Sequence, residues 1–271
     1  MLSSILLVLG IAVLGFAFRA FKHPISQRLS VACIFASSFF AGYLPSRSWI
    51  AGVFVASIWL FLPLIEILTR IRALRLPRDR ALQHKRPPGQ DLFPNLDSLT
   101  QEIEEQGFEQ ITDLGCNLDS QQQFLRLFHR PSDQVQAAIC LMDQGNLAFH
   151  YLSLMTRSVD GEIFTTWNYP FSYALKFLPQ VHILRVKPQL PFRVICDLHQ
   201  VQIKKAGMTP DKVLNLHPEK IEELLQQDLR AQIAHNVHAG LLAPVNAEEV
   251  RYTWRGLFYL WLHVLWDFVR L

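Results

Sequence analysis

The amino-terminal quarter of the chain is built from three long apolar runs separated by short polar segments. The runs cover residues 2–18, 29–44 and 49–68, and the third carries a single charged residue, Glu66, near its end. A helix rises about 1.5 Å per residue, so about 20 apolar residues match the ~30 Å hydrocarbon core of a bilayer. The pattern predicts three transmembrane helices within a transmembrane region of residues 1–69.

Basic residues after these runs set the expected orientation. Arg19, Lys22 and Arg28 follow the first run, Arg47 follows the second, and a denser cluster follows the third. That cluster consists of Arg70, Arg72, Arg75, Arg78, Arg80, Lys85 and Arg86. Because cytoplasmic loops carry the excess of Lys and Arg, we expect the amino terminus outside and the chain after the third run in the cytoplasm. A signal peptide is the alternative for the first run, but its cations would precede the apolar core.

Residues 70–90 are predicted to form a basic linker that lies against lipid. Prolines and a glycine between residues 77 and 89 interrupt any helix there. A cation next to an anionic membrane surface contributes about 1 kcal/mol. We therefore predict lipid head-group contacts, with the bilayer as the first expected partner, and membrane topology alone is the alternative explanation. The predicted contact residues are Arg70, Arg72, Arg75, Arg78 and Arg80.

The segment after the linker shows the alternation of apolar and polar residues that is typical of strands. Val135, Ala137, Ile139 and Leu141, for example, fall on one side of their run. Strands that follow one another through short turns pair with their neighbours, so we expect an antiparallel sheet of four or five strands. The predicted strands are 109–116, 123–129, 134–142, 147–156 and 162–168, with an edge strand over 182–186.

Helical patterns lie on both sides of these strands in the sequence. A capping box, Ser98-x-x-Gln101, predicts the start of the first helix. A second helix is predicted over 191–206 with a buried stripe, and a third over 218–239 with proline in its first turn. The predicted stripe consists of Val194, Ile195, Leu198 and Val201. These elements predict an α+β domain over residues 91–245, with helices covering the sheet.

The last segment, residues 246–271, predicts an amphipathic helix. Tryptophan, phenylalanine and aliphatic residues dominate it, while Arg251, Arg255, His263 and Asp267 recur at multiples of four. An apolar helix with one polar stripe is typical of a helix lying in a membrane interface, which is the expected position here. A fourth span would place several charges in lipid, and burial in the soluble core is the other alternative.

The charge distribution argues against nucleic-acid binding. The net charge is +3, yet eleven of the 26 Lys and Arg lie in residues 1–90. The other fifteen face 21 of the 23 acids in residues 91–271, a balance of about −6. The basic character therefore belongs to the membrane flanks. The four cysteines form no CxxC pair, so we expect neither a disulfide framework nor a zinc knuckle.

Four histidines are candidates for a catalytic or metal-binding role. His150, and His199 with its neighbour Asp197, are candidates for acid/base catalysis, with structural hydrogen bonding as the alternative. His235 and His238 stand three residues apart on a predicted helix, where two metal ligands could share one side. No third ligand follows in sequence, so we expect no metal and no cofactor.

An aromatic stretch over 164–177 is the candidate ligand pocket. Trp167, Asn168, Tyr169 and Tyr173 combine aromatic rings with polar groups, as the walls of a small-molecule cleft do. Core packing of the same aromatic side chains is the alternative interpretation.

Together these observations favour a non-catalytic, membrane-anchored binding or scaffold subunit whose further partners are other membrane-protein subunits. The GxSxG, Walker A and Rossmann glycine patterns are absent from the sequence. The alternative is a membrane-anchored enzyme that acts on a lipid-soluble or membrane-proximal substrate through histidine acid/base chemistry.

Overall fold

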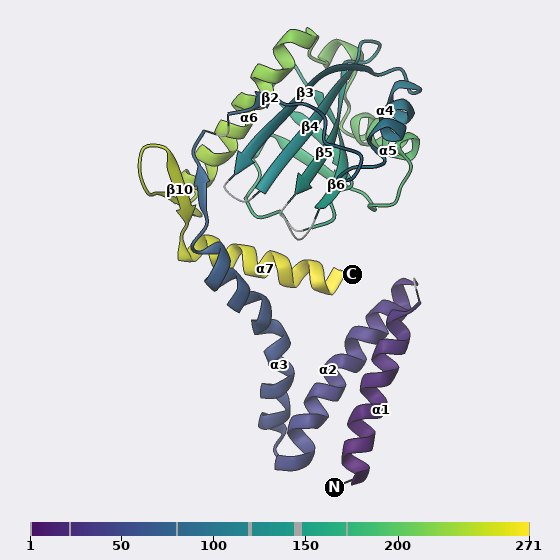
Figure 1. Ribbon diagram of the computed structural model, residues 1–271, viewed down its shortest axis with the longest axis vertical. Coiled ribbons are helices and arrows are strands. Elements are labelled where there is room, and N and C mark those ends of the chain that lie inside the picture. The colour runs from purple at the N-terminus through teal and green to yellow at the C-terminus, as the bar shows by residue number, and fades with distance from the viewer. Residues whose placement is uncertain are drawn as a thin grey trace. The chain divides into compact units, whose positions relative to one another are not determined.

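A computed structural model describes residues 2–21, 23–79, 81–118, 121–143, 148–171 and 173–270 (Figure 1). The chain divides into two compact units. The first unit comprises Met1–Leu74, Ser172–Ala174 and Tyr252–Leu271, and the second comprises Arg75–Phe171 and Leu175–Arg251. The chain passes from one unit to the other at paired strands, since Arg75 and Arg251 are register partners in an antiparallel ladder.

The first unit is helical. It contains α1 (Leu2–Arg19), α2 (Pro24–Ser46), α3 (Trp49–Glu66) with a π-helical turn over Ile67–Ile71, and α7 (Trp254–Arg270). Helices α2 and α3 approach closely at Gly42, where an added Cβ would lie 2.5 Å from the Ala51 carbonyl oxygen. Small residues at such a crossing allow two backbones to meet, as expected for helices that pack in lipid.

Two helices of this unit are long and apolar enough to cross a membrane, by length and composition, within the described residues. They are Ile25–Ser46 and Trp49–Ile71. The described apolar stretch of α1, Ser4–Arg19, is shorter. At about 1.5 Å per residue it falls short of a ~30 Å hydrocarbon core. The prediction of three spans is therefore corrected to two candidate spans and one shorter apolar helix.

The second unit is organised around a seven-stranded sheet in the order β2-β3-β4-β5-β6-β7-β8. Neighbouring strands are antiparallel except β7 and β8, which are parallel. The predicted antiparallel run of consecutive strands is confirmed, but the sheet is larger than four or five strands. Its strands are β2 (Gln83–His84), β3 (Glu109–Leu118), β4 (Gln121–Arg130), β5 (Val135–Asp143), β6 (Ala148–Arg157), β7 (Ile163–Trp167) and β8 (Val181–Arg185).

A second, three-stranded sheet lies beside it in the order β1-β10-β9. Its strands are β1 (Arg75–Pro77), β9 (Leu242–Pro244) and β10 (Glu249–Tyr252). Strands β1 and β2 both fall within the segment predicted as a linker. They have three and two residues, too few to show an alternating pattern.

Helices cover both faces of the large sheet, so the second unit has three layers (Figure 1). One face packs against α4 (Leu96–Glu104) and α5 (Phe192–Lys205). The other packs against α6 (Pro218–His238), where Ile221 joins Leu125, Leu127 and Tyr151 in one buried cluster. The sheet is therefore an interior layer with apolar side chains on both sides.

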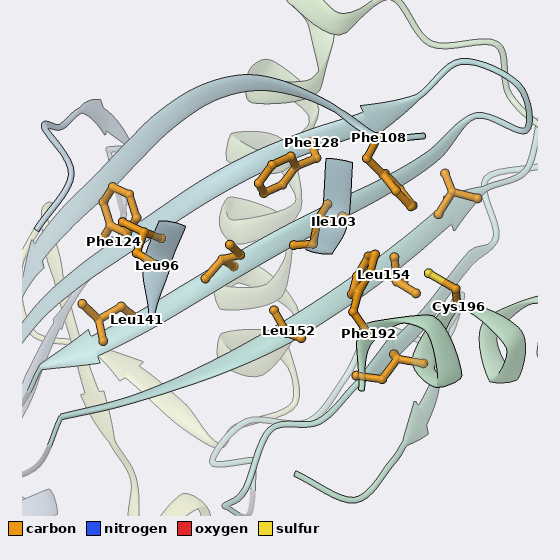
Figure 2. Packing of buried hydrophobic residues seen from close by; sticks show 14 of the residues in the cluster. Leu96, Ile103, Phe108, Phe124, Phe128, Leu141, Leu152, Leu154, Phe192 and Cys196 are labelled. Atoms are coloured by element: carbon orange, nitrogen blue, oxygen red, sulfur yellow. The ribbon is translucent and has the colours of Figure 1, made fainter. Parts of the chain in front are cut away.

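Figure 2 shows the buried cluster on the α4 and α5 side. Phe128 and Leu154 come from the sheet, Ile103 from α4 and Phe192 from α5, and each is fully buried. The alternating residues of β5 confirm their prediction, because all four are buried in this cluster. They are Val135, Ala137, Ile139 and Leu141.

Two helix predictions are wrong in detail. In α5, Val194 and Val201 are 38% and 46% exposed, whereas Cys196 and His199 are buried. The buried side of α5 includes His199, a polar residue with hydrogen-bond partners. The positions of the apolar residues alone therefore did not predict which side of the helix is buried. The predicted capping box is not formed either, because the Ser98 hydroxyl donates to the Asn95 carbonyl at 3.0 Å.

Candidate functional site

His199 is the candidate acid/base residue with the best-defined surroundings. It is 1% exposed on the inner side of α5. Its Nε2 lies 3.0 Å from the Thr156 hydroxyl of β6, and its Nδ1 lies 2.9 Å from the Thr166 hydroxyl of β7. The Thr166 hydroxyl donates to Gln202 Oε1 at 2.7 Å. Thr166 therefore accepts from Nδ1–H, and Nε2 accepts from Thr156.

This hydrogen bonding requires a neutral imidazole, and the electrostatics agree. Burial lowers the pKa of His199 from 6.5 to about 4, because the charged ring would lose its hydration. Asp133 and Arg130 act on the same pKa in opposite directions. Both ring nitrogens are thus occupied by threonine hydroxyls inside the core, an arrangement that holds α5 on the sheet.

The other two acid/base candidates, His150 and Asp197, do not form a site with His199. His150 stands six residues before Thr156 on β6, which corresponds to about 20 Å at ~3.3 Å per residue. Its ring stacks on Phe93 with 4.8 Å between centroids, and partial burial lowers its pKa. Asp197 is exposed on α5. Within the described residues no hydrogen bond joins Asp197 to His199, so the three candidates do not assemble.

His235 and His238 stand three residues apart on α6, the helical spacing that the sequence predicted. His238 is exposed, while the Nε2 atom of His235 is buried without a hydrogen-bond partner in the described part of the chain. No group of three or more His, Cys, Asp or Glu that could hold a metal occurs among the described residues. The pair is therefore not completed to a metal site there.

The aromatic pocket candidates are packed against one another. Trp167 and Tyr169 have 5.5 Å between ring centroids, and Tyr151 lies 4.9 Å from Tyr169. Asn168 is buried, its Oδ1 accepting from the Leu152 amide at 2.6 Å and its Nδ2 donating to the Pro188 carbonyl at 3.1 Å. Tyr173 belongs to the first unit. Trp167, Asn168 and Tyr169 thus contribute packing and fixed hydrogen bonds.

Replacing Asn168 with Ala tests this structural role. We expect Asn168→Ala to lower the free energy of unfolding by about 1–3 kcal/mol, because the buried Leu152 amide loses its acceptor and the Pro188 carbonyl loses its donor. Urea denaturation of the full chain measures this loss, with Asn95→Ala as the control at a site without a side-chain cap bond. An unchanged denaturation midpoint for Asn168→Ala would contradict the assignment.

The residues of the basic cluster after α3 make different contacts. The Arg72 guanidinium carbon lies 4.4 Å from the centre of the Trp254 ring, and an Arg70 nitrogen lies 3.7 Å from Glu66. Arg75 pairs with Glu249 at 3.1 Å. Arg78 lines a cleft. Arg80, the fifth predicted lipid contact, lies outside the described residues.

Helix α7 carries an exposed apolar stripe that follows i, i+4 spacing. Its members are each between 49% and 59% exposed: Trp254, Phe258, Leu262 and Trp266. Leu257 and Leu260 are buried on the other side of the helix. The amphipathic character of the segment agrees with its prediction, but Arg251 lies in β10 rather than in the helix. The fourfold spacing of the large apolar residues is the sequence signal that identifies the exposed side.

Helix α7 packs against the second half of α3 inside the first unit. The Trp261 indole nitrogen donates to the Leu60 carbonyl at 2.9 Å, and the Trp261 and Phe61 rings stack with centroids 6.0 Å apart. Figure 1 shows α7 running across the end of α3 rather than alongside it. These contacts fix α7 across the second half of α3.

A cleft in the second unit lies between one side of α6 and the turns of the small sheet. Its volume is about 810 Å³. The α6 side contributes apolar residues together with Arg230 and His238, while Asp79 lies just after β1 and Glu248 just before β10. Asp79 binds Arg230 through two hydrogen bonds of 2.8 Å, and the pKa of Asp79 is lowered by this contact. No local pattern in the sequence predicts this cleft, because its walls lie about 150 residues apart in the chain.

Comparison of the chain with protein-family models, with curated proteins and with solved structures finds no match.

Proposed function

We propose that this chain is an integral membrane protein in which α2 and α3 cross the bilayer, α7 lies in the cytoplasmic interface, and the second unit is a cytoplasmic, non-catalytic binding or scaffold module. The observation that carries this proposal is the apolar surface of the first unit. In each candidate span only 11% of the most apolar window is buried. A core helix of a soluble protein would be mostly buried.

The exposed side chains of these helices are large. Trp49, Phe54 and Ile65 are examples from α3, and each is more than half exposed. Burial of apolar surface contributes about 25 cal/mol per Å², so such a surface is stable only when lipid or protein covers it. The alternation of loop charges supports a cytoplasmic position for the second unit.

The α7 stripe supports an interfacial position for this helix. Tryptophan is favoured at the level of the lipid head groups, and Trp254 and Trp266 stand at the two ends of the stripe. Arg72 lies over Trp254, so the aromatic stripe begins beside the basic cluster. Aromatic rings next to cations match the chemistry of a head-group layer with anionic lipids.

The non-catalytic character rests on the acid/base candidates of the second unit. Both nitrogens of His199 are bound to threonines, and His150 is stacked on Phe93 well away from it. Packed side chains fill both faces of the large sheet. Binding at a surface or cleft therefore has more structural support than chemistry at the sheet.

Membrane fractionation combined with labelling tests this proposal. We expect the chain to stay in the membrane pellet after carbonate extraction, because α2 and α3 are embedded. A cysteine introduced by Asp160→Cys, at an exposed turn, should react with a membrane-impermeant maleimide only after the cells are opened. Release by carbonate, or labelling of intact cells, would contradict the proposal.

A fluorescent label on the α7 stripe tests the position of this helix. With an environment-sensitive fluorophore attached after Leu262→Cys in a Cys33→Ala background, we expect blue-shifted emission in vesicles. The reason is that Leu262 stands in the exposed apolar stripe, which lipid would cover. The same fluorophore after Asp160→Cys serves as the control and should emit as in water. Equal emission from both sites would contradict an interfacial α7.

A further inference from the structure

The cleft between α6 and the small sheet has a lining of balanced charge over an apolar floor. Its lining includes two cations, Arg78 and Arg230, and two anions, Asp79 and Glu248, together with His238. Ile233, at 2% exposure, is part of the floor. Pro77, Ala234, Val237 and Ala247 complete the apolar lining. The cleft volume of about 810 Å³ lies in the range of small-molecule sites.

Of the two cations and two anions in the cleft, one oppositely charged pair is bound together, and the side chains of the other pair have no partner among the described residues. Asp79 and Arg230 bind each other, and Gln226 donates to Asp79 Oδ1 at 2.9 Å. Arg78 and Glu248 are joined only through their backbones, where the Arg78 amide donates to the Glu248 carbonyl at 2.6 Å. Within the described part of the chain, their side chains form no hydrogen bond or ion pair. A cation and an anion therefore stand at adjacent positions, both open to a ligand.

A ligand that satisfies both side chains carries both charges. A guanidinium binds phosphate oxygens through charge-assisted hydrogen bonds, and a carboxylate accepts from a primary ammonium. A simple anion would bind Arg78 but would leave the nearby Glu248 carboxylate facing a like charge. A phosphate and an ammonium linked by a short chain match the pair.

The covalent chain limits how far this cleft can lie from the candidate span Trp49–Ile71. Arg78 follows Ile71 by seven residues, and Glu248 precedes Trp254 of α7 by six. Because an extended chain covers at most ~3.6 Å per residue, the seven residues to Arg78 span at most about 25 Å from Ile71, the last residue of the π-helical turn after α3. If α3 spans the bilayer, the cleft is within reach of the lipid head groups.

We infer that this cleft binds the zwitterionic head group of a phospholipid of the phosphoethanolamine type, with Arg78 on the phosphate and Glu248 on the ammonium. This assignment rests on the proposed membrane location as the source of the lipid. It identifies the ligand class of the binding module.

Calorimetric titration of the full chain tests the assignment. The chain is reconstituted in nanodiscs of phosphatidylglycerol only and titrated with glycerophosphoethanolamine, the water-soluble head group. We expect saturable binding, weakened about tenfold or more by Arg78→Gln and by Glu248→Gln, since each removes one charge-assisted hydrogen bond. Arg193→Gln, at an exposed position on α5, is the matched control and should bind like the unmodified chain.

The probes separate the competing ligands. Glycerophosphate, which lacks the ammonium, should bind more weakly than glycerophosphoethanolamine to the unmodified chain. Equal binding of the two probes, or full binding by Glu248→Gln, would show an anion site and overturn the assignment. An absence of binding by the unmodified chain would also overturn it.

Carbonate extraction of the same chain separates this inference from the proposed function. A chain that stays in the membrane but binds no head group overturns the cleft assignment alone. A chain that carbonate releases but that binds glycerophosphoethanolamine supports the cleft and overturns the membrane location.

Discussion

Arg126→Leu should lower the free energy of unfolding of the second unit by about 3–5 kcal/mol, because it leaves the carboxylate of Asp113 buried without its partner. The two residues are register partners on β4 and β3. Arg126 Nε and Nη2 each donate to Asp113 at 2.8 Å, and Nη1 donates to the Thr100 hydroxyl at 2.9 Å. The side chains are only 8% and 13% exposed.

The electrostatics of Arg126 agree with this geometry. The hydrogen bond to Asp113 raises the pKa of Arg126, against the opposing effect of burial. The double variant Asp113→Leu with Arg126→Leu is the decisive control. Replacing both charges by apolar side chains removes the desolvation cost together with the attraction, so most of the lost stability should return. Urea denaturation in detergent micelles measures the three chains. Equal losses in the single and double variants would show that the ion pair is not the cause.

The stability of the second unit should also fall on acidification because of His199. The unfolded chain takes up a proton near pH 6.5, whereas the folded chain resists protonation until about pH 4. Between these values the unfolded state binds more protons, so the free energy of unfolding decreases as the pH falls. The contribution is intact above pH 6.5. It is lost progressively toward pH 4, by about 3 kcal/mol in total at ~1.36 kcal/mol per pKa unit.

A variant without the titrating ring tests this pH dependence. His199→Gln retains a polar side chain but cannot be protonated, so its stability should change less between pH 7.5 and pH 4.5 than that of the unmodified chain. Urea midpoints followed by near-ultraviolet circular dichroism give the comparison. Parallel pH profiles for the two chains would assign the acid sensitivity to other groups.

Alternation in the sequence predicted the middle of the sheet well, since the buried set Val135 to Leu141 of β5 required only a period of two. The same rule missed β2, because two residues contain no period. It also gave no sign that Arg126 lies on the buried side of β4 between Phe124 and Phe128. A charged residue is ordinarily assigned to water, and only the facing Asp113 makes its burial stable.

The candidate sites show the same division. His150, His199 and Asp197 were predicted as candidates from their residue types. Residue type does not show whether side chains from different elements meet. The structure places His199 between two threonines from β6 and β7, whose hydroxyls occupy both ring nitrogens. The cleft of Arg78 and Glu248 was beyond sequence reasoning, because long-range strand pairing between β1 and β10 creates it.

The sequence by itself determined the apolar helices near the amino terminus, the basic cluster after them, the consecutive antiparallel strands and an amphipathic last helix, because each depends on residues close together in the chain. Only the tertiary structure decided that both faces of the sheet are covered, that Arg126 and His199 are buried with partners, and that α7 packs on α3. These features depend on contacts between distant segments, and local patterns of solvation carry no information about which partner a buried polar group will meet.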